Sequence, residues 1–145
     1  MKVSIEEISK QQDEEILIRC HEVNDRITEI VSKLNTETLL VLGYQNEQVH
    51  RIKLSDIYYF EAVDGKVFMY GKDSVYEVKQ KLYELEDLFK GKNCFRASKS
   101  TILNIAKITS ISPSLSGRFV AVLDNGERAV ISRQYVPVLK KMLGL

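Results

Sequence analysis

Cysteine, histidine and proline are scarce in this sequence, which contains two of each among 145 residues. Cys20 and Cys94 have no second pair and no close spacing, which argues against a disulfide framework or a zinc site. We expect both to be reduced, structural thiols. Neither His21 nor His50 has a partner at a spacing that would build a metal site or a nucleophile and base pair. No metal is therefore expected.

The common signatures of enzymes are also missing. The sequence has no G-x-x-x-x-G-K-[ST], no G-x-G-x-x-G and no G-x-S-x-G. An acidic cluster of Glu84, Glu86 and Asp87 is typical of a solvated helix face and not of a catalytic carboxylate pair. We expect a non-enzymatic protein with no catalytic residue, no cofactor and no small-molecule substrate.

Targeting and membrane segments are not indicated either. The N-terminus lacks the apolar core of a signal peptide, and apolar runs such as Leu39 to Leu42 are far too short to span a bilayer. The remaining composition, 44% hydrophobic and 28% charged, is that of a soluble globular protein. The expected location is the cytoplasm, and the length suits one compact domain with a short extra segment.

The distribution of charge is uneven, although the formal net charge is only +1. Residues 1–50 carry five basic and ten acidic side chains, whereas residues 90–145 carry ten basic and only two acidic ones. A basic stretch attracts polyanions, because each phosphate that Lys or Arg neutralises releases condensed counterions. Nucleic acid is a candidate partner; the alternative is a set of solvated lysines balanced by the acidic N-terminal part.

The N-terminal part reads as two strands and a helix. Residues 2–8 and 14–20 have strand character, and the polar run Ser9 to Glu15 between them predicts a turn. From Glu22 to Asn35, apolar residues recur every three to four positions, which predicts a helix with one apolar stripe. A small strand and helix subdomain is expected here.

The rest of the chain reads as antiparallel strands with two further helices. Asp64-Gly65 and Asn125-Gly126 are strong hairpin signals, because Gly accepts a positive φ. A short helix is expected before Gly91, and a C-terminal helix has Pro137 in its first turn. The expected strands cover residues 38–43, 48–54, 57–63, 66–70, 76–78, 102–111, 119–123 and 128–132. The predicted fold class is mainly β (α+β).

An ordered set of segments in the C-terminal two thirds carries a family resemblance. These segments are Ile57 to Val67 (IYYFEAVDGKV), Leu82 to Glu86 (LYELE), Phe95 to Ser100 (FRASKS), Asn104 with Ile108, Leu123 to Glu127 (LDNGE), and Ser132 to Tyr135 (SRQY) with Leu139. In this order and spacing they resemble the LytTR family of DNA-binding domains, over roughly residues 42 to 143. The resemblance implies an elongated fold of antiparallel β-sheets whose loops enter successive major grooves of double-stranded DNA.

The resemblance also implies which residues contact bases. Base contacts in such domains come from three places, which fall here on Asp64 to Lys66, on Lys99 and on Arg133. The predicted base-contacting residues are Gly65, Lys66, Lys99 and Arg133. Arginine donates two parallel N–H bonds to guanine O6 and N7. The alternatives are a structural salt bridge for Arg133 and simple solvation for Lys99.

A second group has donors suited to phosphate oxygens, which fix the register of a protein on DNA without reading sequence. This group consists of Arg96, Ser98, Ser100, Ser132 and Gln134. Arg96 has an alternative role in an internal ion pair with Glu61 or Glu127. Many family members carry His at the position of Ser98, whose shorter hydroxyl makes it a weak candidate for base reading. Phe95, Ile102 and Tyr135 are expected in the core.

These observations predict a sequence-specific, DNA-binding transcription regulator that acts as a homodimer. Residues 42–145 form the DNA-binding domain, and residues 1–41 form a small β/α appendage for dimerisation or regulation, too short for a receiver domain. Short proteins of this kind resemble regulators encoded beside small membrane proteins, so a membrane-protein antagonist is a conceivable partner. The competing hypotheses are an interaction module for an acidic protein or anionic surface, and an RNA-binding β surface, which needs exposed aromatics such as Tyr58, Phe60 and Phe68.

Overall fold

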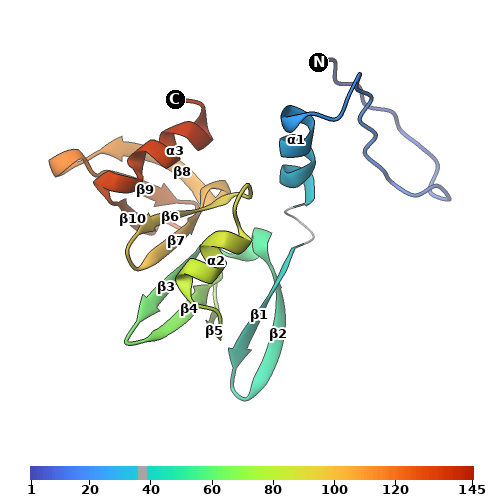
Figure 1. Cartoon of the computed structure of the whole chain (residues 1–145). Coiled ribbons are helices and arrows are strands. Elements are labelled where there is room, and N and C mark those ends of the chain that lie inside the picture. The colour runs from blue at the N-terminus through green and yellow to red at the C-terminus, as the bar shows by residue number, and fades with distance from the viewer. Residues whose placement is uncertain (36–38) are drawn as a thin grey trace.

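Two antiparallel sheets and three α-helices make up the part of the chain that the computed structural model describes, residues 1–35 and 39–145 (Figure 1). The helices are α1 (Asp25–Asn35), α2 (Leu82–Leu88) and α3 (Val136–Leu143). The strands are β1 (Leu40–Gln45), β2 (Gln48–Lys53), β3 (Tyr59–Val63), β4 (Lys66–Tyr70), β5 (Val75–Val78), β6 (Cys94–Ser98), β7 (Thr101–Asn104), β8 (Ile108–Pro113), β9 (Phe119–Leu123) and β10 (Arg128–Ile131). The mainly β prediction is confirmed.

The first sheet has seven strands in the order β2-β1-β5-β4-β3-β7-β6, and the second has three in the order β10-β9-β8. Every pairing is antiparallel. Both Gly-containing turns occur where the sequence predicts them, with Gly65 at φ 78° and Gly126 at φ 87°. The short connections explain the antiparallel order, because a two-residue turn returns the chain beside itself.

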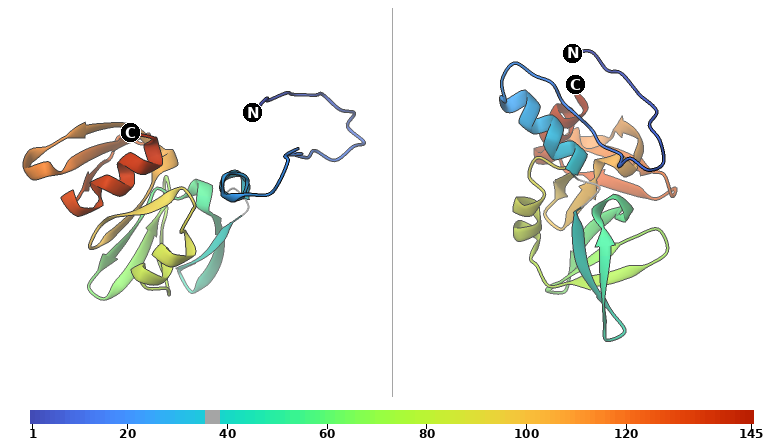
Figure 2. Two further views of the ribbon diagram at one scale, coloured as in Figure 1. Left: turned by 45° about the horizontal axis from the view of Figure 1, so that its top comes forward. Right: turned by 90° about the vertical axis from the view of Figure 1, so that its right-hand side faces the viewer.

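The apolar residues form two cores, one for each sheet. In the first, α2 covers the seven-stranded sheet, and the rings of Phe60 and Phe89 lie 5.3 Å apart. In the second, α3 packs with β6, β9 and β10 around Leu123, Ile131 and Leu139 (Figures 1 and 2). Phe95 and Ile102 are buried, as predicted, and Tyr135 is partly buried against the second core.

Polar contacts connect the two sheets. The Tyr58 hydroxyl, just before β3, donates a hydrogen bond to the Asp124 carboxylate in the β9–β10 turn. This hydrogen bond raises the pKa of Tyr58 to about 12, and Lys107 Nζ lies 5.1 Å from the centre of the same ring. Within the first sheet, Asn104, almost fully buried at the end of β7, donates to the carbonyl of Ile57 at 2.7 Å. Buried polar groups are stable only when paired in this way.

Several strand boundaries within the sheets differ from the prediction by one or two residues, and the strand β6 was not predicted. The strand expected over residues 102–111 is interrupted by a 3-10 turn at Ile105–Lys107, because the Asn104 side chain accepts a hydrogen bond from Ala106 N at 3.0 Å. The strand expected from Thr38 begins at Leu40 in the structure. Thr38 itself lies outside the described residues.

The hairpin predicted over residues 2–8 and 14–20 is wrong, since residues 1–24 contain no strand. Only the turn forms, with Gln12 N donating to Ser9 O at 3.0 Å. Val3 and Ile5 are 85% and 94% exposed, so the two segments have no sheet or core to cover. Strand preference reflects fit to a neighbouring surface, and an isolated hairpin is marginal in water.

The N-terminal helix is confirmed, three residues shorter than predicted. It begins at Asp25 because Asn24 caps it, accepting a hydrogen bond from Ile27 N at 3.1 Å. Lys92 Nζ holds the helix near the domain by donating to Ser32 O at 3.3 Å. Among residues 1–35 and 39–145, no helix is both long and apolar enough to cross a membrane. The proposed division at residue 41 stays a prediction.

Candidate nucleic-acid interface

Two backbone hydrogen bonds bring the three predicted contact segments to one edge of the molecule. Ala62 N, near the end of β3, donates to Ser100 O in the β6–β7 turn at 2.8 Å. Ser132 N, just after β10, donates to Ala97 O in β6, also at 2.8 Å. The β6–β7 turn therefore lies between the β3–β4 turn on one side and the segment after β10 on the other. Residues 64–66, 98–100 and 132–134 share this edge.

The β3–β4 turn holds two residues in the left-handed region, Asp64 at φ 51° and Gly65 at φ 78°. This geometry is that of a two-residue hairpin turn, in which glycine avoids a steric cost. A Cβ on Gly65 would meet no atom within 4 Å, so backbone conformation and not space selects glycine here. Lys66 follows with its Nζ 3.6 Å from Glu77 Oε1, a mostly exposed pair that phosphate competes with easily.

The β6–β7 turn is fixed by its own serine. Ser98 Oγ accepts a hydrogen bond from Ser100 N at 3.2 Å and lies 3.5 Å from Ser100 Oγ. Lys99, between them, is exposed, and its ammonium makes no hydrogen bond or ion pair with any described residue. The turn thus projects one free cation from a rigid base.

Arg96 supports this turn from inside, and the alternative of an internal ion pair is realised with Glu86 and not with Glu61 or Glu127. Its Nη1 lies 2.9 Å from Glu86 Oε2 on α2, because the side chain extends toward the face of the sheet that this helix covers. Nε donates to the carbonyl of Ser98 at 2.7 Å, and Nη2 donates to that of Lys99 at 2.5 Å. The side chain is only 17% exposed. Its phosphate contact stays a prediction, whereas its support of the loop is observed.

Arg133 begins the 3-10 turn Arg133–Tyr135 that follows Ser132, and it is exposed. No described residue forms an ion pair or hydrogen bond with its guanidinium, so the alternative of a structural salt bridge is not observed in residues 1–35 and 39–145. Gly117, in the β8–β9 loop at φ 75°, leaves room for its aliphatic stem. Sequence reasoning missed this glycine, since its role depends on a contact between distant segments.

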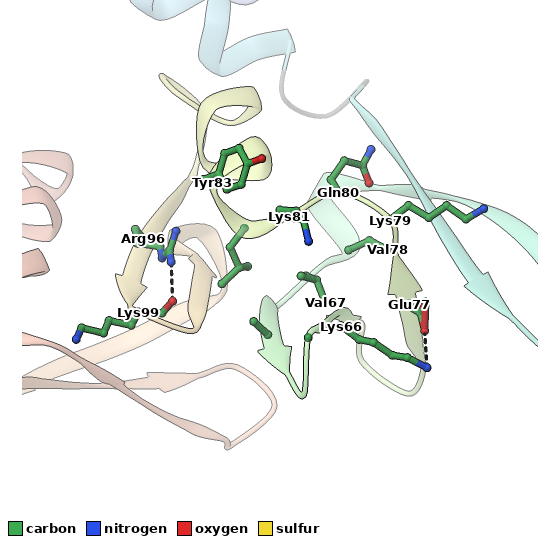
Figure 3. A pocket seen from close by; sticks show the side chains of 13 residues that line it. Lys66, Val67, Glu77, Val78, Lys79, Gln80, Lys81, Tyr83, Arg96 and Lys99 are labelled. Carbon is green, nitrogen blue, oxygen red and sulfur yellow. Dashed lines mark hydrogen bonds and ion pairs between the residues drawn. The ribbon is translucent and has the colours of Figure 1, made fainter.

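A groove of about 640 Å³ lies between the β3–β4 turn and the β6–β7 turn (Figure 3). Its basic lining residues are Lys66, Lys79, Lys81, Arg96 and Lys99. Figure 3 shows Lys81 pointing into the groove from the segment between β5 and α2. Lys79 and Lys81 were not predicted, although their Lys-Gln-Lys sequence directly after a strand was a visible signal. The groove offers positive charge beside the predicted contact turns.

A second hollow, of about 370 Å³, lies on the other side of the β6–β7 turn. Ser98, Ser132, Arg118 and Arg128 contribute to its lining together with Glu61 and Glu127. Burial raises the pKa of the neighbouring Tyr59, and the charge of Glu127 adds to the effect. Arg118 and Arg128 are further exposed cations that the sequence did not single out.

The cysteines and His50 have different surroundings in the structure. The described residues hold no group of three or more His, Cys, Asp or Glu side chains placed to bind a metal ion. Cys94 is buried, which raises the pKa of its thiol to about 12. Cys20 is exposed, so its prediction as a structural thiol is wrong, because nothing in residues 1–24 packs around it. His50 packs against Tyr76, with ring centres 5.1 Å apart.

The aromatic residues considered for RNA stacking are not displayed as a platform. Phe60 is fully buried and Tyr58 is 4% exposed, whereas Phe68 is half-buried. Stacking of unpaired bases requires accessible ring faces on neighbouring strands. The face of these strands that carries Phe60 is core, and Phe68 is the one named aromatic with a partly accessible ring, which weighs against the RNA hypothesis.

Comparison with known proteins gives consistent results. Residues 47–144 match the LytTr DNA-binding domain. The chain is 25% identical over 147 residues to a protein of Staphylococcus aureus strain MSSA476 named as an uncharacterized HTH-type transcriptional regulator, covering 100% of this chain and 99% of that protein. A counterpart in the bovine strain RF122 / ET3-1 is 24% identical with the same coverage.

A solved structure is also similar, namely the LytTr DNA-binding domain of a protein from Bacillus cereus described as a methyl-accepting/DNA response regulator. The TM-score is 0.68 with 29% sequence identity, over 73% of this chain and 97% of that one. Strands separate α1 from α2 and α2 from α3 here. The helix-turn-helix in the relatives' names therefore has no counterpart in an adjacent pair of α-helices among the described residues.

Proposed function

Because the chain belongs to the LytTR family of DNA-binding domains, we propose that it is a transcription regulator that reads the major groove of specific double-stranded DNA through loops. The relatives named as transcriptional regulators support the regulatory role. The observation that carries the loop hypothesis is the pair of hydrogen bonds from Ala62 N and Ser132 N, which joins three contact segments at one edge.

In this proposal, some side chains at this edge contact bases and others hold the loops in position. Arg133 and Lys99 are exposed and unpaired among the described residues, so their donors are free for base edges in the major groove. Gly65 permits close approach of the β3–β4 turn, and Lys66 follows it. Arg96 is engaged with two carbonyls and a carboxylate, and it fixes the position of Lys99.

Phosphate contacts supply the affinity. Ser98 and Ser100 flank Lys99, Ser132 and Gln134 flank Arg133, and Lys79 and Lys81 add charge in the groove beside the β3–β4 turn. Each phosphate neutralised contributes about −0.9 to the slope of log K against log salt concentration. Binding should therefore weaken steeply with salt while the preference among sequences persists.

Selection of bound duplexes from a random pool, at several salt concentrations, tests the proposal. The expected result is one enriched motif whose preference over a scrambled duplex survives when total affinity falls with salt. Equal retention of every duplex, abolished at moderate salt, would overturn the proposal and favour a module for acidic proteins or anionic surfaces.

A further inference from the structure

The N-terminal arm, defined as residues 1–24, leaves many apolar side chains in water. Beyond Val3 and Ile5, Ile16 is 71% exposed, Leu17 68% and Val23 77%. Soluble monomers rarely display so much apolar side-chain surface in one segment, and such surface usually marks an interaction site. The strand preference of residues 14–20 indicates that this part of the arm would be covered by pairing as a β-strand with a neighbouring strand.

The seven-stranded sheet ends in an unpaired edge strand at the side nearest α1, the helix that follows the arm. In that sheet, β2 has a neighbour on one side only, β1. An edge strand presents a row of unpaired N–H and C=O groups, on which another extended segment can dock. Val49 on β2 is 57% exposed, and Leu42 on the adjacent β1 is 44% exposed. This edge thus offers both backbone donors and apolar surface.

The positive charge of β2 makes this edge selective for the strand that can pair with it. The strand β2, Gln48–Lys53, contains His50, Arg51 and Lys53 and no acidic residue, and such cations normally discourage strand pairing. Residues 14–20, with the sequence EEILIRC, begin instead with two glutamates. Despite Arg19 near its other end, this segment has a net negative charge, and a basic edge accepts such a strand because opposite charges on neighbouring strands attract.

Alternation of side chains gives this pairing a consistent pattern. Successive residues of a strand point to opposite faces, so Ile16 and Ile18 would share one face, and Glu15 and Leu17 the other. Arg51 pairs with Leu42 across β1 and β2, on the exposed face of that hairpin. Glu15 and Leu17 would extend this mixed face, and the two isoleucines would extend the side on which Val41 is buried.

The arm of one chain is badly placed to reach its own β2. Figures 1 and 2 show the arm leaving α1 at the end away from the sheet. The helix of 11 residues is about 16 Å long at a rise of about 1.5 Å per residue. Asn24 is fixed as its cap. Only residues 21–23 remain to double back, and a fully extended chain covers at most about 3.5 Å per residue.

We propose that the chain forms a symmetric homodimer in which residues 14–20 of each copy add as a strand to β2 of its partner. Both copies give an arm and both receive one, so the contact closes on itself and leaves no open end for a fibre. The β6–β7 turn, at the opposite side of the seven-stranded sheet from β2, stays accessible. The inference is independent of the proposed DNA specificity.

Analytical ultracentrifugation of the full chain, with paired charge reversals, tests this exchange without DNA. The wild type is expected to sediment as a dimer at micromolar concentration. Each double variant, E14K/E15K in the arm or R51E/K53E in β2, should raise the dimer dissociation constant about tenfold or more, because like charges then oppose one another. The matched controls E6K/E7K and K72E/K90E make the same changes in charge elsewhere and should leave the dimer intact.

Mixing the two double variants identifies which chain donates the arm. In a mixed dimer both contacts regain opposite charges, so the mixture should form heterodimers although neither variant dimerises well alone. A monomeric wild type would overturn the proposal. A dimer that neither charge reversal weakens would also overturn it. A third contrary result is that mixing the two weakened variants does not restore dimerisation, whereas one chain carrying all four substitutions dimerises again. That pattern would indicate that the arm pairs with β2 of its own chain.

Discussion

Gly117 packs against the aliphatic stem of Arg133, so closely that a Cβ atom at position 117 would lie 2.9 Å from Arg133 Cδ. The two residues come from different loops. Glycine at position 117 suits both its positive φ of 75° and the close approach of the Arg133 stem, so we expect it to help position that arginine. Two predictions depend on this relationship.

Arg133→Ala should remove sequence discrimination at one base pair, worth about 1 to 3 kcal/mol for a good bidentate contact. The measurement is a competition assay with the selected duplex and each of its single-base variants. Arg26→Ala, which removes the same charge from the exposed surface of α1, is the control and should lower affinity for all duplexes only slightly. Unchanged preference in Arg133→Ala would refute the base-reading assignment.

Gly117→Ala should reduce the same discrimination by displacing Arg133, although residue 133 is unaltered. It should also cost about 1 to 3 kcal/mol of stability, because residue 117 has a positive φ. Gly126→Ala is the matched control: Gly126 has φ +87° and open space around the position of its Cβ. That variant should lose similar stability in a denaturant titration but keep its sequence preference.

Arg96→Ala should weaken binding to all duplexes and also reduce discrimination at the base pair proposed for Lys99, since the arginine holds the loop that presents Lys99. It should also destabilise the fold by about 1 to 3 kcal/mol, because the Ser98 and Lys99 carbonyls lose their donor and Glu86 loses its partner. Glu86→Gln separates the two effects, as it weakens the ion pair but leaves both carbonyl contacts. Unchanged affinity and unchanged preference in Arg96→Ala would contradict its support of the Lys99 loop.

Stability should fall as pH rises between about 10 and 12. Tyr58 has its pKa raised from 10.0 to about 12 by the hydrogen bond to Asp124. The folded state holds this proton more tightly than the unfolded state, so the contribution is complete below pH 10 and is lost above it. Tyr58→Phe should show a shallower fall in denaturant titrations over this range. The remaining slope comes from Tyr59, Tyr70 and Cys94, whose pKa values burial also raises.

Gly43→Ala should destabilise the fold, because a Cβ there would lie 2.6 Å from Met69 Cε and 2.6 Å from Tyr76 Cβ. Overpacking of this kind costs about 1 to 3 kcal/mol. Gly71→Ala is the comparison, since its Cβ would meet the nearest atoms at 3.6 Å. Thermal unfolding should show a clearly lower midpoint for the first variant and little change for the second; equal midpoints would contradict the packing argument.

The sequence by itself determined most of the sheet architecture, because its signals are local. Asp64-Gly65 and Asn125-Gly126 define turns through the conformations that glycine accepts, and the apolar spacing after Leu82 requires one helix face. The ordered Phe-Arg-x-Ser-x-Ser and Ser-Arg-x-Tyr segments identified the family. Local preference failed in residues 1–24, where strand-prone residues lack a neighbour with which to pair.

Tertiary structure alone decided what each side chain at the proposed DNA-contacting edge contacts within the protein. Arg96 and Arg133 are the same residue type in two equally suggestive motifs, yet Arg96 is engaged with Glu86 and two carbonyls, whereas the Arg133 guanidinium has no hydrogen-bond or ion-pair partner among residues 1–35 and 39–145. The difference depends on α2 and on Gly117, both distant in sequence. Hydrogen bonds and packing act over a few ångströms, so they join residues by proximity in space, which the order of residues along the chain does not record.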